Sequence, residues 1–212
     1  MKGVTFGERH SYRNFNLILI EKEIGAPHVK TKLIEIDGAD GSIDLTDFFG
    51  EPKYGNVTHK FTFSSIVPWN DLLSQYSEVK NALHGKKLRI ILDDDPSFYY
   101  VGRCYVSSFT NEKNISTITV ECECEPYKYK LNQTVVTRAV SGTADITLTN
   151  SRKRAVPTIT ATASMTLEFG DGSWAKGAGT YTIPELELTE GANHVTVTGV
   201  GNITFTWQEG DL

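Results

Sequence analysis

The stretch from residue 87 to residue 105 constrains the fold most strongly, because it contains two β-rich runs joined by a turn. The runs cover residues 88–92 and 98–106, and the sequence Asp-Asp-Asp-Pro-Ser separates them. β-Branched and aromatic residues favour strands, whereas Asp, Pro and Ser supply backbone geometry that a strand lacks. The stretch therefore predicts a β-hairpin, and we expect the first half of the chain to form a sheet around it.

Other segments of the first half also have the pattern of strands. Residues 14–20 and 32–36 are short apolar runs, and residues 57–65 and 117–125 alternate between apolar and polar side chains. A period of two is typical of a strand with one buried face. His59 falls on the apolar face of its strand, which favours a hydrogen-bonded core histidine over a metal ligand.

The cysteines indicate buried, reduced thiols. Cys122 and Cys124 share the apolar face of their strand, and no further ligands lie nearby to complete a zinc site. A disulfide between residues two apart on one strand would be strained. The chain has three cysteines, an odd number, and its N-terminus has no apolar signal-peptide core. We therefore expect synthesis in a reducing cytosol.

One segment, residues 70–84, predicts a helix. Asn70 is suited to cap its start, and Gly85 is placed to end it. Four apolar residues recur at helical spacing and form one stripe: Leu72, Tyr76, Val79 and Leu83. We expect this stripe to pack against the sheet of the same domain.

Two acidic stretches invite a ligand-binding interpretation that their residues do not support. Residues 36–45 contain glycines among aspartates, but they lack the lysine of a phosphate-binding loop and the glutamate that ends a calcium loop. We interpret this stretch as a tight connection between two strands. Asp93, Asp94 and Asp95 could suggest acid–base or metal chemistry. We interpret them instead as solvated residues at the tip of a turn.

The second half of the chain differs in composition. Residues 131–212 carry only 13 charged residues and are rich in Thr, Ala and Gly, so we expect two domains, at residues 1–130 and 131–212. Short alternating strands with glycine turns at residues 170–172 and 199–201 predict a small β-sandwich.

The charge of the chain argues against a nucleic-acid binder. The net charge is −5, and residues 1–130 carry 16 Lys and Arg against 18 Asp and Glu. Neutralising phosphates requires a basic excess. The one basic run, residues 152–154, is interpreted as a solvated loop. No apolar run approaches the roughly 20 residues that span a bilayer.

We find no catalytic, cofactor-binding or metal-binding constellation in the sequence, so we expect neither an enzyme nor a cofactor. The five histidines show no metal-ligand spacing. The residues alone indicate a structural or binding protein. One alternative is a carbohydrate-binding β-sandwich with Trp174 and Trp207 as stacking platforms, although Trp207 falls on the inward face of its strand.

Several short motifs follow one another in an order that resembles a known family. They are Phe6-Gly7-Glu8-Arg9-His10-Ser11, Asp37-Gly38-Ala39-Asp40-Gly41, Tyr54-Gly55-Asn56, Leu83-His84-Gly85, Tyr99-Tyr100-Val101-Gly102-Arg103, Cys124-Glu125-Pro126-Tyr127, Leu188-Thr189-Glu190-Gly191-Ala192-Asn193 and Val197-Thr198-Gly199. This succession is similar to that of the distal tail protein (Dit) family of long-tailed, non-contractile phages. It extends over nearly the whole chain. The family usually has a proline before the loop glycine, where this chain has Asp37.

The resemblance implies a mainly β fold. It consists of an N-terminal β-sandwich or split barrel with one packed helix, followed by a small C-terminal sandwich of galectin or jelly-roll type. The second half is too short for the inserted carbohydrate-binding modules that some relatives carry.

The resemblance also implies an assembly: a hexameric ring at the virion tail tip, formed by the N-terminal domains on the major tail protein of the tail tube. The ring would join the tube to the tail-associated, baseplate and receptor-binding proteins and let DNA pass through its lumen. The protein would be made in the cytoplasm of a bacterial host, or be encoded by a prophage. A chain without a basic patch suits this role, because a channel that held DNA tightly would stall its ejection.

Overall fold

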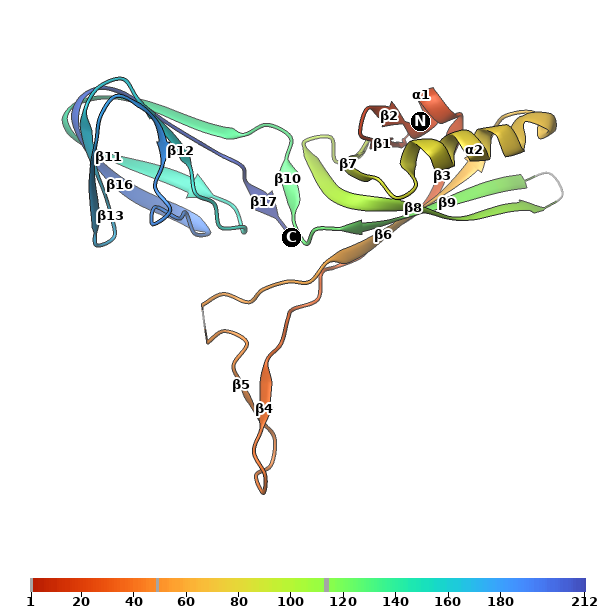
Figure 1. Cartoon of the computed structure of the whole chain (residues 1–212), viewed down its shortest axis with the longest axis horizontal. Coiled ribbons are helices and arrows are strands. Elements are labelled where there is room, and N and C mark those ends of the chain that lie inside the picture. The colour runs from red at the N-terminus through yellow and green to blue at the C-terminus, as the bar shows by residue number, and fades with distance from the viewer. Residues whose placement is uncertain (1, 49, 113–114) are drawn as a thin grey trace. The chain divides into compact units, whose positions relative to one another are not determined.

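The computed structural model describes residues 2–48, 50–112 and 115–212 (Figure 1). The chain divides into two compact units, residues 1–128 together with residue 212, and residues 129–211. Both units are built mainly from antiparallel strands. The mainly β fold predicted from the sequence is therefore confirmed.

The first unit is built on one antiparallel sheet. In order across the sheet, its strands are β2 (Arg9–His10), β1 (Val4–Phe6), β7 (Lys87–Leu92), β8 (Phe98–Glu112), β9 (Ile115–Cys124), β6 (Val57–Ser65) and β3 (Leu17–Ile24). The predicted hairpin is β7–β8, in which Ile90 pairs with Tyr100. It lies in the middle of the sheet, so the first unit is organised around it as expected.

The core of the first unit lies on one face of this sheet. Phe61 and Phe63 of β6 are fully buried, and each makes an edge-to-face contact with Phe6, at centroid distances of 5.9 and 6.2 Å. The predicted inward residues of β9 are buried beside them, including Ile118 and Val120. Burying side chains of this size stabilises the fold by about 1.5–3 kcal/mol each.

Helix α2 (Leu72–Leu83) covers part of this core, as the apolar stripe predicted. A 3₁₀ turn, η1 (Trp69–Asp71), precedes it, so the α-helix begins two residues later than expected. Asn70 is not its cap; Asp71 occupies that position, without a side-chain capping bond. Buried Gln75, which the apolar pattern missed, donates from Nε2 to the carbonyl of Phe15 at 2.6 Å.

A short helix, α1 (Ser11–Phe15), replaces the start of the strand expected at residues 14–20. His10 caps it: the imidazole Nδ1 accepts hydrogen bonds from the backbone N–H groups of Tyr12 and Arg13, at 3.1 and 3.2 Å. Asn16 ends it in the left-handed region, at φ 53°. The prediction failed here because histidine is not among the residues normally associated with capping.

Between β3 and β6 the chain leaves the sheet as a long hairpin, which we call the arm (residues 26–56; Figure 1). Its outer part pairs β4 (Leu33–Glu35) with β5 (Ser42–Asp44). Residues 36–41 therefore connect two strands, as predicted, but residues 42–44 of the predicted connection form β5 itself. The arm contributes no residue to the described hydrophobic core of the first unit.

The second unit is built on a ribbon of two long strands, β11 (Thr134–Asn150) and β16 (Gly191–Trp207). Four shorter strands complete its main sheet: β12 (Thr158–Ala161), β13 (Met165–Phe169), β14 (Gly172–Lys176) and β15 (Gly179–Thr182). Two further short strands, β10 (Lys128–Lys130) and β17 (Gly210–Asp211), pair with each other. The predicted inward residues Ile159, Leu167, Val197 and Phe205 are all fully buried.

The glycines at 199 and 201 do not form the turn expected at residues 199–201. They lie inside β16, which pairs with β13 before them and with β12 after them. A Cβ atom on Gly199 would lie 2.8 Å from Met165 Cγ, and one on Gly201 would lie 2.7 Å from Thr162 Oγ1. Glycine is required here because neighbouring groups approach the strand too closely for any side chain.

Candidate functional site

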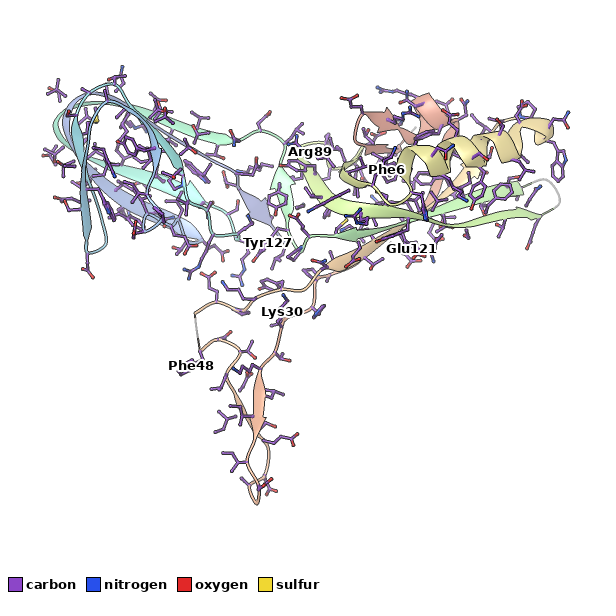
Figure 2. The ribbon with its side chains drawn as sticks, viewed as in Figure 1. Phe6, Lys30, Phe48, Arg89, Glu121 and Tyr127 are labelled. Atoms are coloured by element: carbon purple, nitrogen blue, oxygen red, sulfur yellow. The ribbon has the colours of Figure 1, made fainter. Side chains whose placement is uncertain are left out.

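The arm is held in register by backbone hydrogen bonds. Val29 bridges Tyr54, the N–H of Lys30 donates to the carbonyl of Lys53 at 2.7 Å, and Leu33 pairs with Asp44 farther out. Figure 2 shows Lys30 near the base of the arm. The arm is therefore an ordered two-stranded ribbon.

Apolar side chains of this ribbon are exposed. All residues from His28 to Asp44 are exposed. Four aliphatic side chains among them have exposed fractions of 44% or more: Leu33, Ile34, Ile36 and Ile43. A two-stranded hairpin is at best marginally stable by itself in water, and contiguous exposed apolar groups mark an interaction surface. The arm has the properties of a segment that a partner covers.

The base of the arm is fixed by two glycines. A Cβ atom on Gly25 would lie 2.7 Å from the carbonyl oxygen of Thr58, and one on Gly55 would lie 2.1 Å from the His28 ring. At Gly25 the close neighbour is a backbone atom, so only glycine fits there, whereas a side chain at position 55 would require the exposed His28 ring to move. Close packing therefore constrains the chain where the arm leaves the sheet.

The three consecutive aspartates lie in the turn between β7 and β8, and Asp93 and Asp94 are exposed as predicted, but their carboxylates also bind other segments of the chain. Asp93 Oδ2 accepts hydrogen bonds from His10 Nε2 at 3.0 Å and from the backbone N–H of Gly3 at 2.8 Å. Asp94 pairs with Lys22, and Asp95 Oδ2 lies 2.9 Å from Lys128 Nζ. Each carboxylate therefore ties the turn to a different segment of the first unit.

These contacts affect the pKa values of the aspartates. Burial would raise the pKa of Asp93, but the hydrogen bonds from His10 and Gly3 outweigh it and lower that pKa. The hydrogen bond from Lys22 lowers the pKa of Asp94. Both carboxylates are therefore ionised at neutral pH, which suits ion pairing and gives no general acid.

His59 is buried as predicted, with 1% of its surface exposed, but the predicted hydrogen bond is not found. Neither ring nitrogen has a hydrogen-bond partner among the described residues. Its cross-strand neighbours, Ile24 and Cys122, offer no strong polar group, and Tyr100 presents its ring at a centroid distance of 4.4 Å. Burial lowers the pKa of His59, so the ring is neutral at neutral pH.

The three cysteines are fully buried and reduced. Cys104 and Cys122 are cross-strand partners on β8 and β9, and their Sγ atoms lie 3.3 Å apart. The sequence alone does not reveal this pair, because it depends on the register of two strands. The hydrogen bond to Cys104 and burial raise the pKa of Cys122, and burial raises the pKa of Cys124 to about 12.

We expect all three thiols to be inert in the folded protein, because burial shields each of them from a reagent, and the raised pKa of Cys122 and Cys124 also suppresses their reactive thiolates. A thiol reagent added to the native protein should modify them no faster than the protein unfolds. Ser108→Cys, at an exposed position of β8, is the matched control and should react at once. Rapid modification of Cys122 in the native protein would contradict the assignment to the core.

The tryptophans give little support to a carbohydrate site. Trp207 is 2% exposed, and its Nε1 donates to Asn150 Oδ1 at 3.1 Å, so it belongs to the core as its strand position indicated. Trp174 lies in β14, packs against the core of the second unit and lies over Gly172. Trp207 is therefore not available for stacking on a sugar, and Trp174 is only partly exposed.

The basic run at residues 152–154 is less solvated than predicted, because Arg152 pairs with Glu190 at 2.6 Å and Arg154 with Glu187 at 3.0 Å. Across residues 2–48, 50–112 and 115–212, no group of three or more His, Cys, Asp or Glu side chains could hold a metal ion. None of the helices described is long and apolar enough to cross a membrane.

The architecture defines a class of two-unit β proteins. The first unit carries a helix on its sheet and a long hairpin arm, and the second is a sheet built on one bent ribbon. No family model and no curated protein matches the sequence.

Among solved structures, the fold is similar to that of the phage SPP1 Dit protein, with a TM-score of 0.71 and 16% sequence identity over 100% of both chains. That protein is described as a paradigm of the hub adsorption apparatus in phages that infect Gram-positive bacteria. The resemblance to Dit proteins predicted from short motifs is thus confirmed at the level of the fold.

Proposed function

We propose that this chain is a structural component of a phage tail tip, a hub to which other tail components attach. The similarity to the SPP1 hub protein extends over the whole of both chains, and this supports the proposal. The single observation that carries it is the arm, an ordered ribbon with exposed aliphatic side chains that needs a partner. No catalytic role is part of the proposal.

The proposed assembly is a hexameric ring formed by the first domain, residues 1–130, with the second domain, residues 131–212, outside it. A closed ring requires a heterologous interface, in which one surface of each copy meets a different surface of the next. The arm supplies one such surface. Residues 38–47 were expected near this contact from the sequence; residues 38–41 belong to the outermost turn of the arm, and residues 42–44 form β5.

The ring would join the tail tube to the tail-associated, baseplate and receptor-binding proteins, with DNA passing through its lumen. The charge distribution supports this role. The first unit carries no basic excess, so DNA would not be held by neutralised phosphates during passage.

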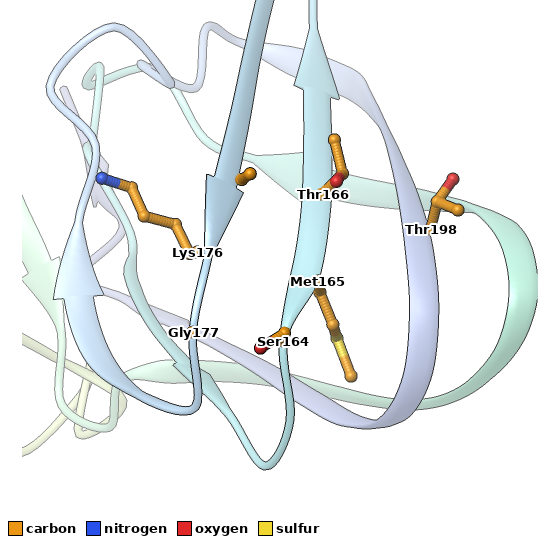
Figure 3. Close-up of a pocket in the computed structure, with 7 residues that line it drawn as sticks. Ser164, Met165, Thr166, Lys176, Gly177 and Thr198 are labelled. Atoms are coloured by element: carbon orange, nitrogen blue, oxygen red, sulfur yellow. The ribbon is translucent and has the colours of Figure 1, made fainter.

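A carbohydrate-binding function is less well supported. The second unit has a hollow of about 290 Å³ lined by residues that include Ser164, Met165, Thr166, Lys176 and Thr198 (Figure 3). None of the described residues lining it is aromatic, so it lacks a ring on which a sugar could stack.

The decisive test is cross-linking in phage particles that contain the chain. A short amine-reactive cross-linker should give a ladder of products that ends at six copies, with the linked lysines mainly in residues 1–130. A ladder that stops at two copies, or cross-links confined to residues 131–212, would reject the hexameric ring. The carbohydrate-binding function would then be the better supported hypothesis.

A further inference from the structure

His59 lies at the point where the chain leaves the sheet of the first unit and enters the arm (Figure 1). It pairs across the sheet with Ile24, the last residue of β3, and this is the final pair of the β3–β6 ladder. We call residues 24–27 and 57–59 the arm root. Whatever happens to the His59 ring therefore acts on the place where the arm is attached.

The His59 ring is buried without being satisfied. Its side chain and backbone together are 1% exposed, and both ring nitrogens lack hydrogen-bond partners among the described residues. Buried polar groups are nearly always hydrogen-bonded, so the closed arm root carries an uncompensated cost. A phenyl ring could fill this place without that cost. The property that an imidazole adds is the ability to take up a proton near neutral pH.

The groups around the ring do not favour its charged form. The titratable ones come from the elements packed against it: Tyr100 of β8, Cys122 and Cys124 of β9, Lys128 of β10, and the α-carboxylate of Leu212. Burial raises the pKa of Tyr100, as the contacts described above raise those of the two thiols, so all three groups are neutral at neutral pH. Lys128 has the same charge as a protonated imidazole and is paired with Asp95 at 2.9 Å. Leu212 is 48% exposed, so water screens its carboxylate.

The end of β3 is the part of the sheet that can move away from His59. β3 lies at the edge of the sheet, and its residues 20–24 are all exposed. Detaching them removes no side chain from the described core, whereas Cys122, on the other side of His59, is fully buried in the interior strand β9. Segments with few buried apolar contacts open at the lowest cost in free energy. Opening at β3 is therefore the easiest route by which the His59 ring can reach water.

We propose that His59 is an acid-operated latch for the arm. When its ring takes up a proton, the end of β3 separates from β6, the charged imidazole reaches water, and the arm becomes free to change direction at its root. The pairing of β4 with β5 is not involved, so the arm moves as one ribbon. The inference concerns a single copy and does not depend on the proposed ring.

The direction of the pH dependence follows from burial. Burial lowers the pKa of His59 in the closed root below its ordinary value of 6.5, so the open root binds the proton more tightly. The closed root is therefore at its most stable above pH 6.5 and becomes less stable as the pH falls towards the lower pKa. If the closed root takes up no proton, the opening constant rises about tenfold one pH unit below the ordinary value.

Amide hydrogen exchange of the full-length protein measures this opening constant, as the ratio of observed to intrinsic exchange rates. Between about pH 7.5 and about pH 5.5, we expect it to rise about tenfold for residues 21–25 and to stay constant for residues 88–92 in the middle of the sheet. The pair of Lys22 with Asp94 also holds the end of β3, but it keeps its charge in this range. The hydrogen bond from Lys22 holds the pKa of Asp94 below its ordinary value of 3.8.

Two variants assign the effect to one histidine. In His59→Phe the opening constant of residues 21–25 should no longer change with pH, because the ring that takes up the proton is gone. His28→Gln is the matched control: His28 lies beside the same root but is exposed, and this variant should keep the full pH dependence. An opening constant that is independent of pH in the unmodified protein, or one that rises equally in His59→Phe, would overturn the proposal.

A second measurement needs no substitution and covers the case in which His59→Phe does not fold. NMR of the unmodified protein follows the His59 ring and the amides of Ile24 and Gly25 through the same pH titration. We expect a midpoint below 6.5 for the ring and the same midpoint for both amides, because protonation and opening are one event. A ring that titrates at 6.5, or amides that do not follow it, would show that His59 is no latch.

Discussion

Replacing residues 29–54 with a two-residue turn is expected to abolish ring formation and leave the first unit folded. The unit should keep its Tm within a few degrees, because no arm residue belongs to the described core and residues 28–44 are all exposed. Assembly should be lost entirely, since the arm is the proposed contact with the next copy. Sedimentation and thermal unfolding of the same sample measure the two effects.

Two further variants identify which property of the arm matters. Substituting Ser for Leu33, Ile34, Ile36 and Ile43 keeps its length and removes its exposed apolar surface, and should disrupt assembly like the deletion. Substituting Ser for Val135 and Val200, which are 57% and 69% exposed in the second unit, should have no effect on assembly. A ring that persists without the arm would show that the copies meet through other surfaces.

A second large effect is expected from Glu209→Gln in the second unit. The Glu209 side chain is 6% exposed and accepts hydrogen bonds from Lys130 at 2.7 Å, from Ser151 at 2.6 Å and from Thr134. Losing this charge should destabilise the unit by about 2 kcal/mol, because hydrogen bonds to a buried charged group are the strong ones. For a unit of this size the Tm should fall by roughly 10 °C.

The Glu209 carboxylate also makes the stability of the second unit depend on pH, and the direction of this dependence follows from its pKa. Burial would raise the pKa of Glu209, but the hydrogen bonds from Lys130, Ser151 and Thr134 lower it below the ordinary value of 4.5. Its contribution to stability is therefore complete above pH 4.5 and is lost as the pH falls through the lower folded-state pKa. Glu209→Gln should remove this component from the acid unfolding curve.

Glu187→Gln is the matched control, because Glu187 is 44% exposed in its pair with Arg154. Exposed pairs contribute about 0–1 kcal/mol, so the change in Tm should be small. Equal effects of the two substitutions would show that the buried position of Glu209 is unimportant.

Local periodicity predicted much of the secondary structure. Strand β6 covers the predicted residues 57–65, and the stripe of α2 is correct apart from its first turn. These elements follow from side chains a few positions apart in the sequence. The burial of Cys122 followed from the same alternation, because a period of two assigns each side chain to one face of the sheet.

The contacts that define the candidate site depend on long-range structure. Asp93 binds His10, 83 positions away, and Asp94 binds Lys22, 72 positions away, so the aspartates were taken for solvated residues. The apolar run near residue 33 predicted a strand, but a pattern cannot tell whether a strand joins the main sheet or leaves it as an arm. The unsatisfied state of His59 depends on which groups surround it in three dimensions.

The ribbon of β11 and β16 has a consequence for how the chain is made. β16 pairs with β11 along all of its 17 residues and also with β12 and β13. During translation, β11 therefore waits without its partner until residues 191–207 have left the ribosome. Residues 1–128 of the first unit have by then been synthesised and can already fold. The growing chain therefore exposes the unpaired edge of β11 while the next tens of residues are synthesised. The second unit can complete its folding only after residues 1–128 have had time to fold.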